Sequence, residues 1–377
     1  MPELPRMPNL DFGVGSFTFE TFPAGADNDA NWESNIRALL ESLPSVYDIE
    51  ITGVESFTPP EGAPADWESD GVLLTPHPDS GKVSFWVTIP ARTQRDITER
   101  TGGGYDYGGA EDFYVVTYYR TFPVSYVFVE RENAPTYEGS QAVVIVREFL
   151  KEETRRHRAA ESIEFAFVEP SPLYCDFALV ASSEPMDQPF RLERFPRQGY
   201  DDFRITYDAA RYDSPYSAIP AFARDLSNEL GYFYESVRIR LRRMKASNDL
   251  RDRTARLMAM TVEKKIIAGI PRFFKSRRLI RDLSLDLIIA DYEFRQEVQT
   301  QQGEAEQLVE RSSGLFQKEI DREVDSAFQA ELDNITNIVQ LIASRQNRGV
   351  DITVLMITSL LGGIIGSIVT FVFTALH

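Results

Sequence analysis

Cysteine and histidine are nearly absent from this chain of 377 residues. Cys175 is the single cysteine, so no disulfide framework and no multi-cysteine zinc site can form within one chain. The three histidines, His77, His157 and His377, do not have the spacing of metal ligands. A Cys175–His157 pair is conceivable for nucleophilic catalysis, but a cysteine in a strand pattern is more often a small buried residue. We therefore expect no metal, no cofactor and no catalytic residue.

Positive charge is also in deficit, because 40 Lys and Arg stand against 58 Asp and Glu, which gives a net charge of −18. This balance argues against nucleic acid or anionic lipid as the main partner of the whole chain. The first 15 residues contain prolines and acids but no apolar core of a signal peptide. We expect most of the protein to lie in the cytoplasm.

Formal charge is missing altogether from the 25 residues 352–376. A helix of that length would be roughly 37 Å long, enough to cross a hydrocarbon layer of about 30 Å. Arg345 and Arg348 precede the segment, and no Lys or Arg follows it. The positive-inside rule then places residues 1–350 in the cytoplasm and His377 outside. The sequence predicts a tail-anchored, single-pass protein of the cell (inner) membrane.

The first 200 residues have the pattern of an α+β domain. Residues 34–43 and 139–162 show helical spacing, whereas 82–91, 112–131 and 163–182 are rich in β-branched and aromatic residues typical of strands. Because the two kinds of segment alternate, we expect a layered fold with helices on one or both faces of a sheet.

Strand patterns end near residue 215, and helical patterns follow. Residues 217–269 are expected to be helical, and a break is expected at "GIPRFF" (269–274). Apolar residues at steps of three and four predict a long stalk helix, unbroken or interrupted, that runs into the membrane helix, with Gly303 and Gly314 as weak points. The predicted domains are a cytosolic α+β domain (1–200), a basic helical segment (201–275), a long acidic stalk helix (276–350) and a transmembrane helix (351–377).

Charge is segregated along the helical part. Residues 232–282 hold 15 Lys and Arg against 5 Asp and Glu, and residues 286–333 hold 13 Asp and Glu against 4 Lys and Arg. The basic helices could pair with the acidic stalk, form a site for a small anion, or lie on a membrane surface. A stalk of about 60 helical residues would hold them roughly 90 Å from the bilayer unless the chain folds back. The candidate residues for charge pairing or anion binding, here called the basic cluster, are Arg238, Arg240, Arg242, Arg243 and Lys245.

Small and hydroxyl side chains gather on one side of the predicted membrane helix. At 100° per residue they fall within about 80° of arc. Such a face allows close helix packing, and it would also suit a narrow pore lined by one helix from each subunit; chance is the third explanation. The residues of this predicted face are Ser359, Gly363, Gly366, Thr370 and Thr374.

The order of these parts, together with "NRGVDITVLMITSLLGG" (347–363), resembles the CorA-type divalent-cation channels. That family has a cytosolic α/β domain, charged helices beside it, and a long stalk helix continuous with a pore helix. The resemblance implies a homo-oligomer and an ion channel. The chain lacks the Gly-Met-Asn loop and the second membrane helix of that family, so no residue here is assigned to an ion-selecting entrance.

Three functional hypotheses follow. The first is a non-enzymatic, homo-oligomeric membrane protein whose cytosolic domain senses a small anionic ligand or a protein and acts through the stalk on clustered membrane helices. It would conduct ions or perturb the membrane, as effectors of bacterial stress or phage defence do. The second is a tail-anchored adaptor with a passive anchor. The third, a membrane-tethered enzyme, has no catalytic constellation to support it.

Overall fold

The computed structural model describes twelve segments of the chain: residues 9–21, 32–55, 80–102, 110–120, 122–131, 139–157, 163–167, 173–197, 199–262, 269–311, 315–324 and 332–344. The chain divides into two compact units. Residues 1–239 and 304–324 make up the first, here called the sheet unit. Residues 240–303 and 325–377 make up the second, here called the helical unit.

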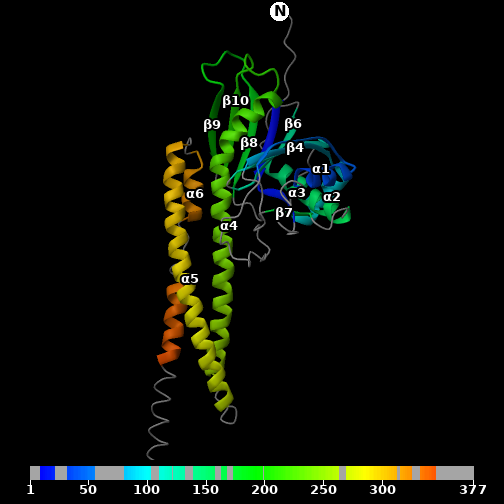
Figure 1. Ribbon diagram of the computed structural model, residues 1–377. Coiled ribbons are helices and arrows are strands. Elements are labelled where there is room, and N and C mark those ends of the chain that lie inside the picture. Colours follow the sequence, from blue (N-terminus) through cyan, green and yellow to red (C-terminus); the bar gives the residue numbers. More distant parts are fainter. Residues whose placement is uncertain are drawn as a thin grey trace, which may run out of the picture. The chain divides into compact units, whose positions relative to one another are not determined.

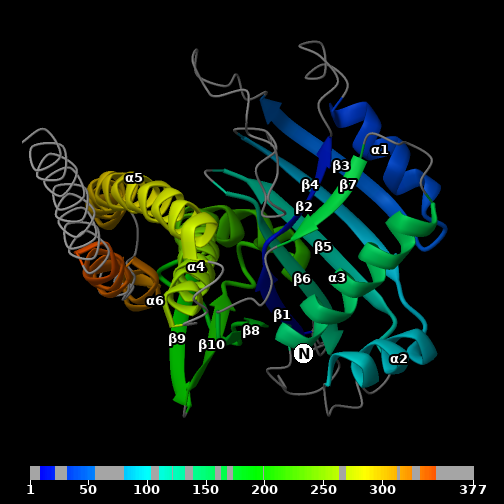
Figure 2. The ribbon, with the colours of Figure 1, turned by 90° about the horizontal axis from the view of Figure 1, so that it is seen from below.

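An eight-stranded sheet forms the centre of the sheet unit (Figures 1 and 2). Neighbouring strands pair antiparallel, except β8 and β10, which are parallel. The strand order is β3 (Val46–Glu55), β4 (Ser80–Thr88), β5 (Asp112–Tyr119), β6 (Val124–Arg131), β1 (Asn9–Gly15), β8 (Cys175–Ala181), β10 (Tyr200–Tyr207) and β9 (Phe190–Arg197). Two further strands, β2 (Phe17–Thr21) and β7 (Ile163–Phe167), pair separately with each other.

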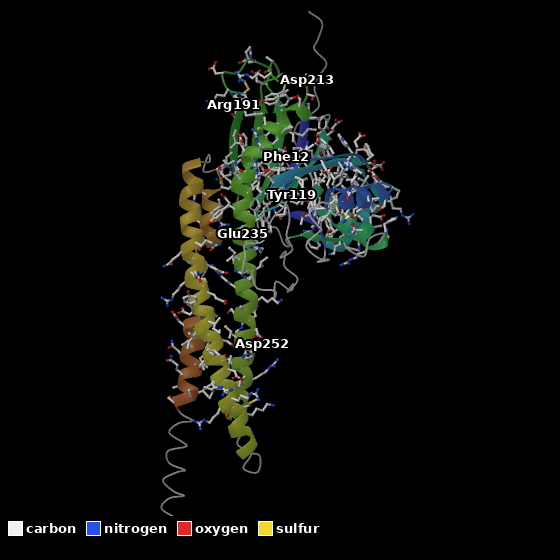
Figure 3. The ribbon with its side chains drawn as sticks, viewed as in Figure 1. Phe12, Tyr119, Arg191, Asp213, Glu235 and Asp252 are labelled. Carbon is white, nitrogen blue, oxygen red and sulfur yellow. The ribbon has the colours of Figure 1, made fainter. Side chains whose placement is uncertain are left out.

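The first part of helix α4 (Pro215–Val262) covers one face of this sheet. Phe12, labelled in Figure 3, is fully buried and lies 5.7 Å from the Phe222 ring between centroids. The buried Tyr126 hydroxyl donates to the Ala223 carbonyl at 3.0 Å. These aromatic side chains fix α4 on the sheet, because each large apolar side chain that is fully buried contributes about 1.5–3 kcal/mol.

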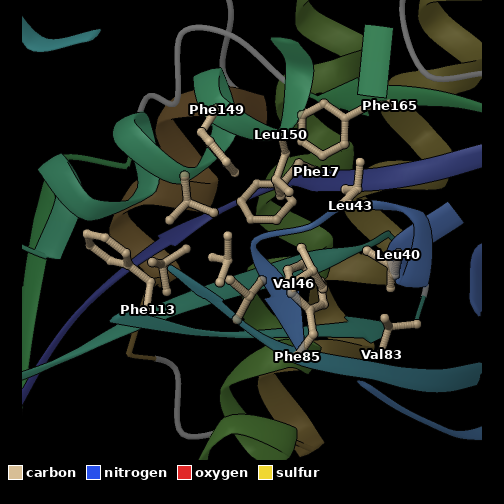
Figure 4. Packing of buried hydrophobic residues seen from close by; sticks show 14 of the residues in the cluster. Phe17, Leu40, Leu43, Val46, Val83, Phe85, Phe113, Phe149, Leu150 and Phe165 are labelled. Carbon is tan, nitrogen blue, oxygen red and sulfur yellow. The ribbon is translucent and has the colours of Figure 1, made fainter. Parts of the chain in front are cut away.

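Helices α1 (Trp32–Ser42), α2 (Ala91–Thr101) and α3 (Gly139–Arg156) belong to the opposite face (Figure 2). Figure 4 shows the apolar core between α1, α3 and the strands, with Leu40, Phe85 and Leu150 among its members. Glycines allow α3 to approach the sheet closely: a Cβ atom on Gly13 would lie 2.2 Å from the carbonyl oxygen of Gly139. A side chain at either glycine would force α3 away from the sheet.

The helical unit contains the second part of α4, helix α5 (Gly269–Arg311) up to residue 303, and a helix over residues 332–344. Helices α4 and α5 are antiparallel, because Arg243 contacts Glu297 whereas Arg253, ten residues later, contacts Asp286. Buried apolar residues of all three helices form one cluster: Leu250, Leu257, Leu283, Leu287, Phe294, Leu332, Ile335 and Val339.

The structure confirms the mixed α+β fold and a long helix. Every segment that the sequence pattern assigned to helix or strand within residues 1–200 contains such an element. Within the stalk predicted over 276–350, α5 ends at Arg311, and residues 315–316 form a turn before α6 (Gln317–Val324), so the helical region is interrupted. At this turn Phe316 is buried within 5.7 Å of the Phe203 ring, and its backbone N–H donates to the Glu229 carboxylate. Burial of that ring favours a turn over continued helix.

Candidate functional site

The predicted membrane face from Ser359 to Thr374 lies outside the described residues, as does the whole predicted transmembrane helix. Within the described segments, no helix has both the length and the apolar character needed to cross a membrane.

The basic cluster lies on α4 and does not converge on one point. Arg238 pairs with Glu235 on its own helix, and its guanidinium lies 5.7 Å from the centroid of the Phe122 ring. Arg240 lies 3.6 Å from the Met244 sulfur, and Lys245 is exposed. The two remaining arginines lie against α5. The structure therefore separates the cluster into residues that contact other elements and residues on the surface of α4.

Arg242 and Arg243 meet one carboxylate of α5. Arg243 Nε donates to Glu297 Oε2 at 2.9 Å, and Arg242 pairs with Glu297 Oε1. Arg243 Nη2 also donates to Gln301 Oε1 at 3.2 Å, and its guanidinium carbon lies 4.4 Å from the Phe294 ring centroid. We call Arg242, Arg243, Phe294, Glu297 and Gln301 the ion-pair layer. All four of its polar side chains are thereby held by defined partners across the two helices.

Burial makes the charge of Arg243 costly. Its side chain is 5% exposed, and burial together with the nearby charge of Arg242 lowers the pKa of Arg243 to about 10. A buried charged group of this kind is a weak source of stability, but it can fix the register of packed helices, because every other register would leave the charge without its partners. The ion-pair layer thus favours the observed alignment of α4 and α5 over others.

A second polar contact lies further along the same helix pair. Arg253 Nη2 on α4 donates to Asp286 Oδ2 on α5 at 2.6 Å, and Arg253 Nη1 lies 3.4 Å from Asp249 (Figure 3, where Asp252 marks this part of α4). Burial alone would lower the pKa of Arg253, but Asp286 and Asp249 together outweigh burial and raise the pKa, so the guanidinium stays charged. Contacts between a basic helix and an acidic helix are what the charge-pairing hypothesis expects. Anion binding by the exposed members of the cluster stays a prediction.

Helix α5 also carries an exposed apolar stripe. Leu285, Ile288, Ile289 and Tyr292 are between 45% and 68% exposed, and their spacing of three and four places them on one side of the helix. The buried side of α5 is formed by other residues, among them Leu283 and Leu287. An apolar stripe on a polar surface is typical of a protein–protein contact.

The sheet holds a set of aspartates that the sequence analysis did not single out. The dipeptide Asp-Phe occurs in three neighbouring strands, as Asp11-Phe12 in β1, Asp176-Phe177 in β8 and Asp202-Phe203 in β10. The three phenylalanines stack beneath α4, with 4.8 Å between the first two ring centroids and 5.1 Å between the last two. Because side chains alternate along a strand, the three aspartates lie on the opposite face. The repeated Asp-Phe dipeptide is the sequence signal by which these three aspartates could have been found.

Each of these buried carboxylates has its own partner. Asp176 Oδ1 accepts the backbone N–H of Ser140 at the start of α3, at 2.5 Å. Asp11 lies 3.5 Å from Arg131 Nε, and Asp202 pairs with Arg197. Burial outweighs the hydrogen bonds at Asp176 and raises its pKa to about 6. No group of three acidic, cysteine or histidine side chains within the described segments is arranged to hold a metal ion.

The candidate nucleophile is poorly suited to catalysis. Cys175 is buried in β8, and burial raises the pKa of its thiol far above the ordinary value, so the thiol stays protonated. His157 Nδ1 lies 3.1 Å from the Glu153 carbonyl oxygen and 3.4 Å from the Glu153 carboxylate. Both side chains are thus occupied by structural roles.

Comparisons with known proteins give no family: no family model, no curated protein and no solved structure matches the chain.

Proposed function

We propose that this protein is a homo-oligomeric, single-pass membrane protein in which a cytosolic α+β domain is coupled through paired helices to clustered membrane helices. It acts without enzymatic chemistry, at the cell (inner) membrane, with the sheet unit in the cytoplasm. The observation that carries the proposal is the uncharged segment 352–376 with its one-sided array of small and hydroxyl residues. A passive anchor does not need that segregation.

The exposed stripe on α5 supports the oligomer. A second copy of the chain would bring an identical stripe, and it would also bring a second membrane helix with a face suited to self-packing. Replacing Ile288 and Tyr292 with Ser should therefore weaken the oligomer. Replacing Arg92 and Arg95, exposed residues of α2, with Ser should leave it unchanged. Equal oligomer stability in both double variants would remove the stripe from the proposal.

The ion-pair layer supports coupling between the domain and the membrane helices. A pair of helices held in one register moves as a unit, and a ligand that favours another alignment must break buried contacts to obtain it. Such a two-state element is what transmission from a sensing domain requires. The ligand is proposed to be a small anion or a protein, and the outcome at the membrane to be ion conduction or loss of the barrier.

Labelling of the two ends of the chain tests the membrane topology. A probe near the N-terminus should be protected in intact cells, and a probe after Leu376 should react with an impermeant reagent. The chain should also remain in membranes after extraction with alkaline carbonate. The reverse labelling pattern would contradict the positive-inside assignment, and complete extraction would contradict membrane insertion.

A pore makes a further demand on the membrane segment. Thr370→Val keeps the shape of the side chain but removes its hydroxyl, so it should reduce conductance while the oligomer stays intact. Unchanged conductance would favour helix packing alone. The second candidate function, a tail-anchored adaptor, is favoured if the membrane segment proves to be monomeric.

A further inference from the structure

The sheet face on which α4 lies carries a row of aromatic side chains near the start of that helix. Tyr47 of β3, Trp86 of β4 and Tyr114 of β5 are directly opposite one another across the strands. The ring centroids of Tyr47 and Trp86 are 6.3 Å apart, and those of Trp86 and Tyr114 are 5.1 Å apart. Tyr216, in the first turn of α4, adds a fourth ring 5.3 Å from Trp86. We call these four residues the aromatic row.

The aromatic row is accessible to a ligand. The alternate residues of β4, among them Phe85, face the apolar core on the other side of the sheet, whereas Tyr47 is 41% exposed and the other three rings are partly buried. Tyr47 lies on β3, the edge strand of the sheet, so a ligand can reach its ring from the side as well as from above. A row of large rings that reaches the surface is typical of a binding surface.

Strands β3, β4 and β5 place little positive charge beside the aromatic row. Over their whole length they contain one cationic residue, Lys82, against the four acidic residues Asp48, Glu50, Glu55 and Asp112. The Lys82 ammonium lies 2.7 Å from Glu50 Oε2, so its charge is already balanced. The three strands therefore leave an excess of negative charge.

Carboxylates lie close to the hydroxyl ends of the row. The Tyr216 hydroxyl donates to Glu130 Oε1 at 2.7 Å. Burial, together with the negative charges of Asp112 and Asp48, raises the pKa of the Tyr47 hydroxyl. All three of these acidic residues are exposed, so they are free to meet a cation that lies across the rings.

Exposed rings and negative charge together select a cation that can also stack. Nucleobases stack on aromatic side chains of a sheet, but carboxylates repel the phosphates that accompany the bases. A quaternary ammonium is bound in a cage of rings, whereas the rings of this row pack against one another. The guanidinium group of arginine is planar, stacks on Trp and Tyr, and donates two hydrogen bonds to one carboxylate. Arginine therefore matches both properties of the surface.

We propose that the aromatic row binds an arginine-bearing segment of a protein partner, whose guanidinium groups stack on the Tyr47 ring and donate hydrogen bonds to Asp48 or Asp112. The proposed function leaves the sensed ligand open between a small anion and a protein, and the row assigns it to a basic protein. That role in sensing rests on the proposed function. Binding at the row itself requires no membrane insertion.

Titration of the full chain in mild detergent with a short fluorescein-labelled peptide, in which Arg and Ser alternate, tests the proposal. Fluorescence anisotropy gives the dissociation constant, and peptides with Lys or Glu in place of Arg show which side chain is recognised. The Lys peptide should bind about fivefold more weakly than the Arg peptide, because an ammonium lacks the planar fork of donors, and the Glu peptide should not bind. Raising the salt concentration to 1 M, where the screening length is about 3 Å, should weaken binding of the Arg peptide.

Two isosteric substitutions supply the matched variant. Asp48→Asn with Asp112→Asn removes two negative charges, and Asn tolerates the positive φ of 51° at position 48. An exposed ion pair accounts for up to about fivefold in an equilibrium constant, so the double variant should bind the Arg peptide about tenfold more weakly. The control, Asp96→Asn with Glu99→Gln, removes two exposed charges from α2 on the other face of the sheet and should bind like the parent.

The aromatic residues locate the bound peptide. Tryptophan emission of the parent should change when the unlabelled Arg peptide binds, and Trp86→Phe, which keeps the other two tryptophans, should abolish that change. Tyr47→Thr removes the most exposed ring and introduces a residue favourable in strands, so it should weaken binding about fivefold. The melting temperature of each variant, measured by circular dichroism, shows that the fold is kept.

Two results would overturn binding at the row and leave the membrane proposal in place. Equal affinity of the Asp48→Asn/Asp112→Asn variant and its α2 control for the Arg peptide would mean that binding follows the net charge of the chain. A change in Trp86 emission with tetramethylammonium or an oligonucleotide, but not with the Arg peptide, would assign the row to another ligand. Conversely, extraction of the chain from membranes by alkaline carbonate, combined with binding that depends on Asp48 and Asp112, would contradict the proposed function and support the row as a binding site.

Discussion

Glu297→Gln is expected to be the most damaging single change in the ion-pair layer. The parent carboxylate receives hydrogen bonds or ion pairs from two arginines, and one of them, Arg243, is 5% exposed. Gln leaves that buried charge with neutral acceptors only. Removing one partner of a buried ion pair costs about 3–5 kcal/mol, but Glu297 is 25% and Arg242 is 50% exposed, so water recovers part of the loss. We expect a loss of about 2–3 kcal/mol.

Arg243→Met should cost far less, although it removes more hydrogen bonds. It eliminates the buried charge and keeps an unbranched side chain next to Phe294. Glu297 retains Arg242, and only Gln301 loses a donor, at a cost of about 1 kcal/mol. Replacing a buried charge by an apolar side chain of similar length is often neutral. We expect Arg243→Met to lie within about 1 kcal/mol of the parent.

Thermal unfolding of the full chain in mild detergent distinguishes the two variants. For a domain of this size 1 kcal/mol corresponds to about 4–8 °C, so Glu297→Gln should lower the helical transition, followed by circular dichroism, by about 10 °C or more. All three tryptophans of the chain belong to the sheet unit, so their fluorescence reports whether that unit is affected. Equal losses for the two variants, or a larger loss for Arg243→Met, would refute the account of the ion-pair layer.

Three further predictions concern single groups. Gly13→Ala should lower the free energy of unfolding, measured by calorimetry, by about 3 kcal/mol or more, because the added Cβ meets the α3 backbone. Gly303→Ala has open space in a helix and should raise that free energy by about 0.5–1 kcal/mol. Equal effects of the two variants would contradict this reasoning. Because the folded pKa of Asp176 is raised to about 6, the stability that its protonated form contributes is complete below about pH 4 and is lost as pH rises through 6. Asp176→Asn should therefore flatten that part of the plot of stability against pH. An unchanged plot would refute this assignment to Asp176. Charge reversal of three α4 arginines should destabilise the protein, more so at low salt where screening is weak, and unchanged melting at low salt would count against pairing. The reversed residues are Arg240, Arg242 and Arg243.

Much of the sheet unit follows from local sequence. The strands β5 and β6 are dense in β-branched and aromatic residues, and α3 has a clear helical period, so all three elements were predicted. Strand β9 was missed because its charged residues look like a loop; it is an edge strand, where charge is tolerated. Strand β1 was missed because Gly13 and Gly15 weaken its pattern, although both glycines serve the close approach of α3.

Tertiary contacts account for the position at which the predicted stalk is interrupted. Phe316 and Ile320 continue the apolar period of the predicted stalk, but Phe316 is buried beside Phe203 of the sheet, and the chain turns there. Periodicity alone does not show which surface an apolar residue will meet. Likewise, charge segregation suggested a pairing of basic and acidic helices, yet it does not show that Arg243 lies opposite Glu297, because that register also depends on packing around Phe294.

The oligomeric state of the full chain in detergent, measured by light scattering, tests the central proposal most directly. Replacing Gly363 and Gly366 with Leu keeps the segment apolar but adds bulk at the predicted contact face, so the variant should stay in the membrane fraction and form smaller or less uniform oligomers. The control replaces Ile364 and Ile368 on the opposite side with Leu and should match the parent. A Gly363/Gly366 variant with the parent's oligomeric state would contradict the proposal and leave the segment as a passive anchor.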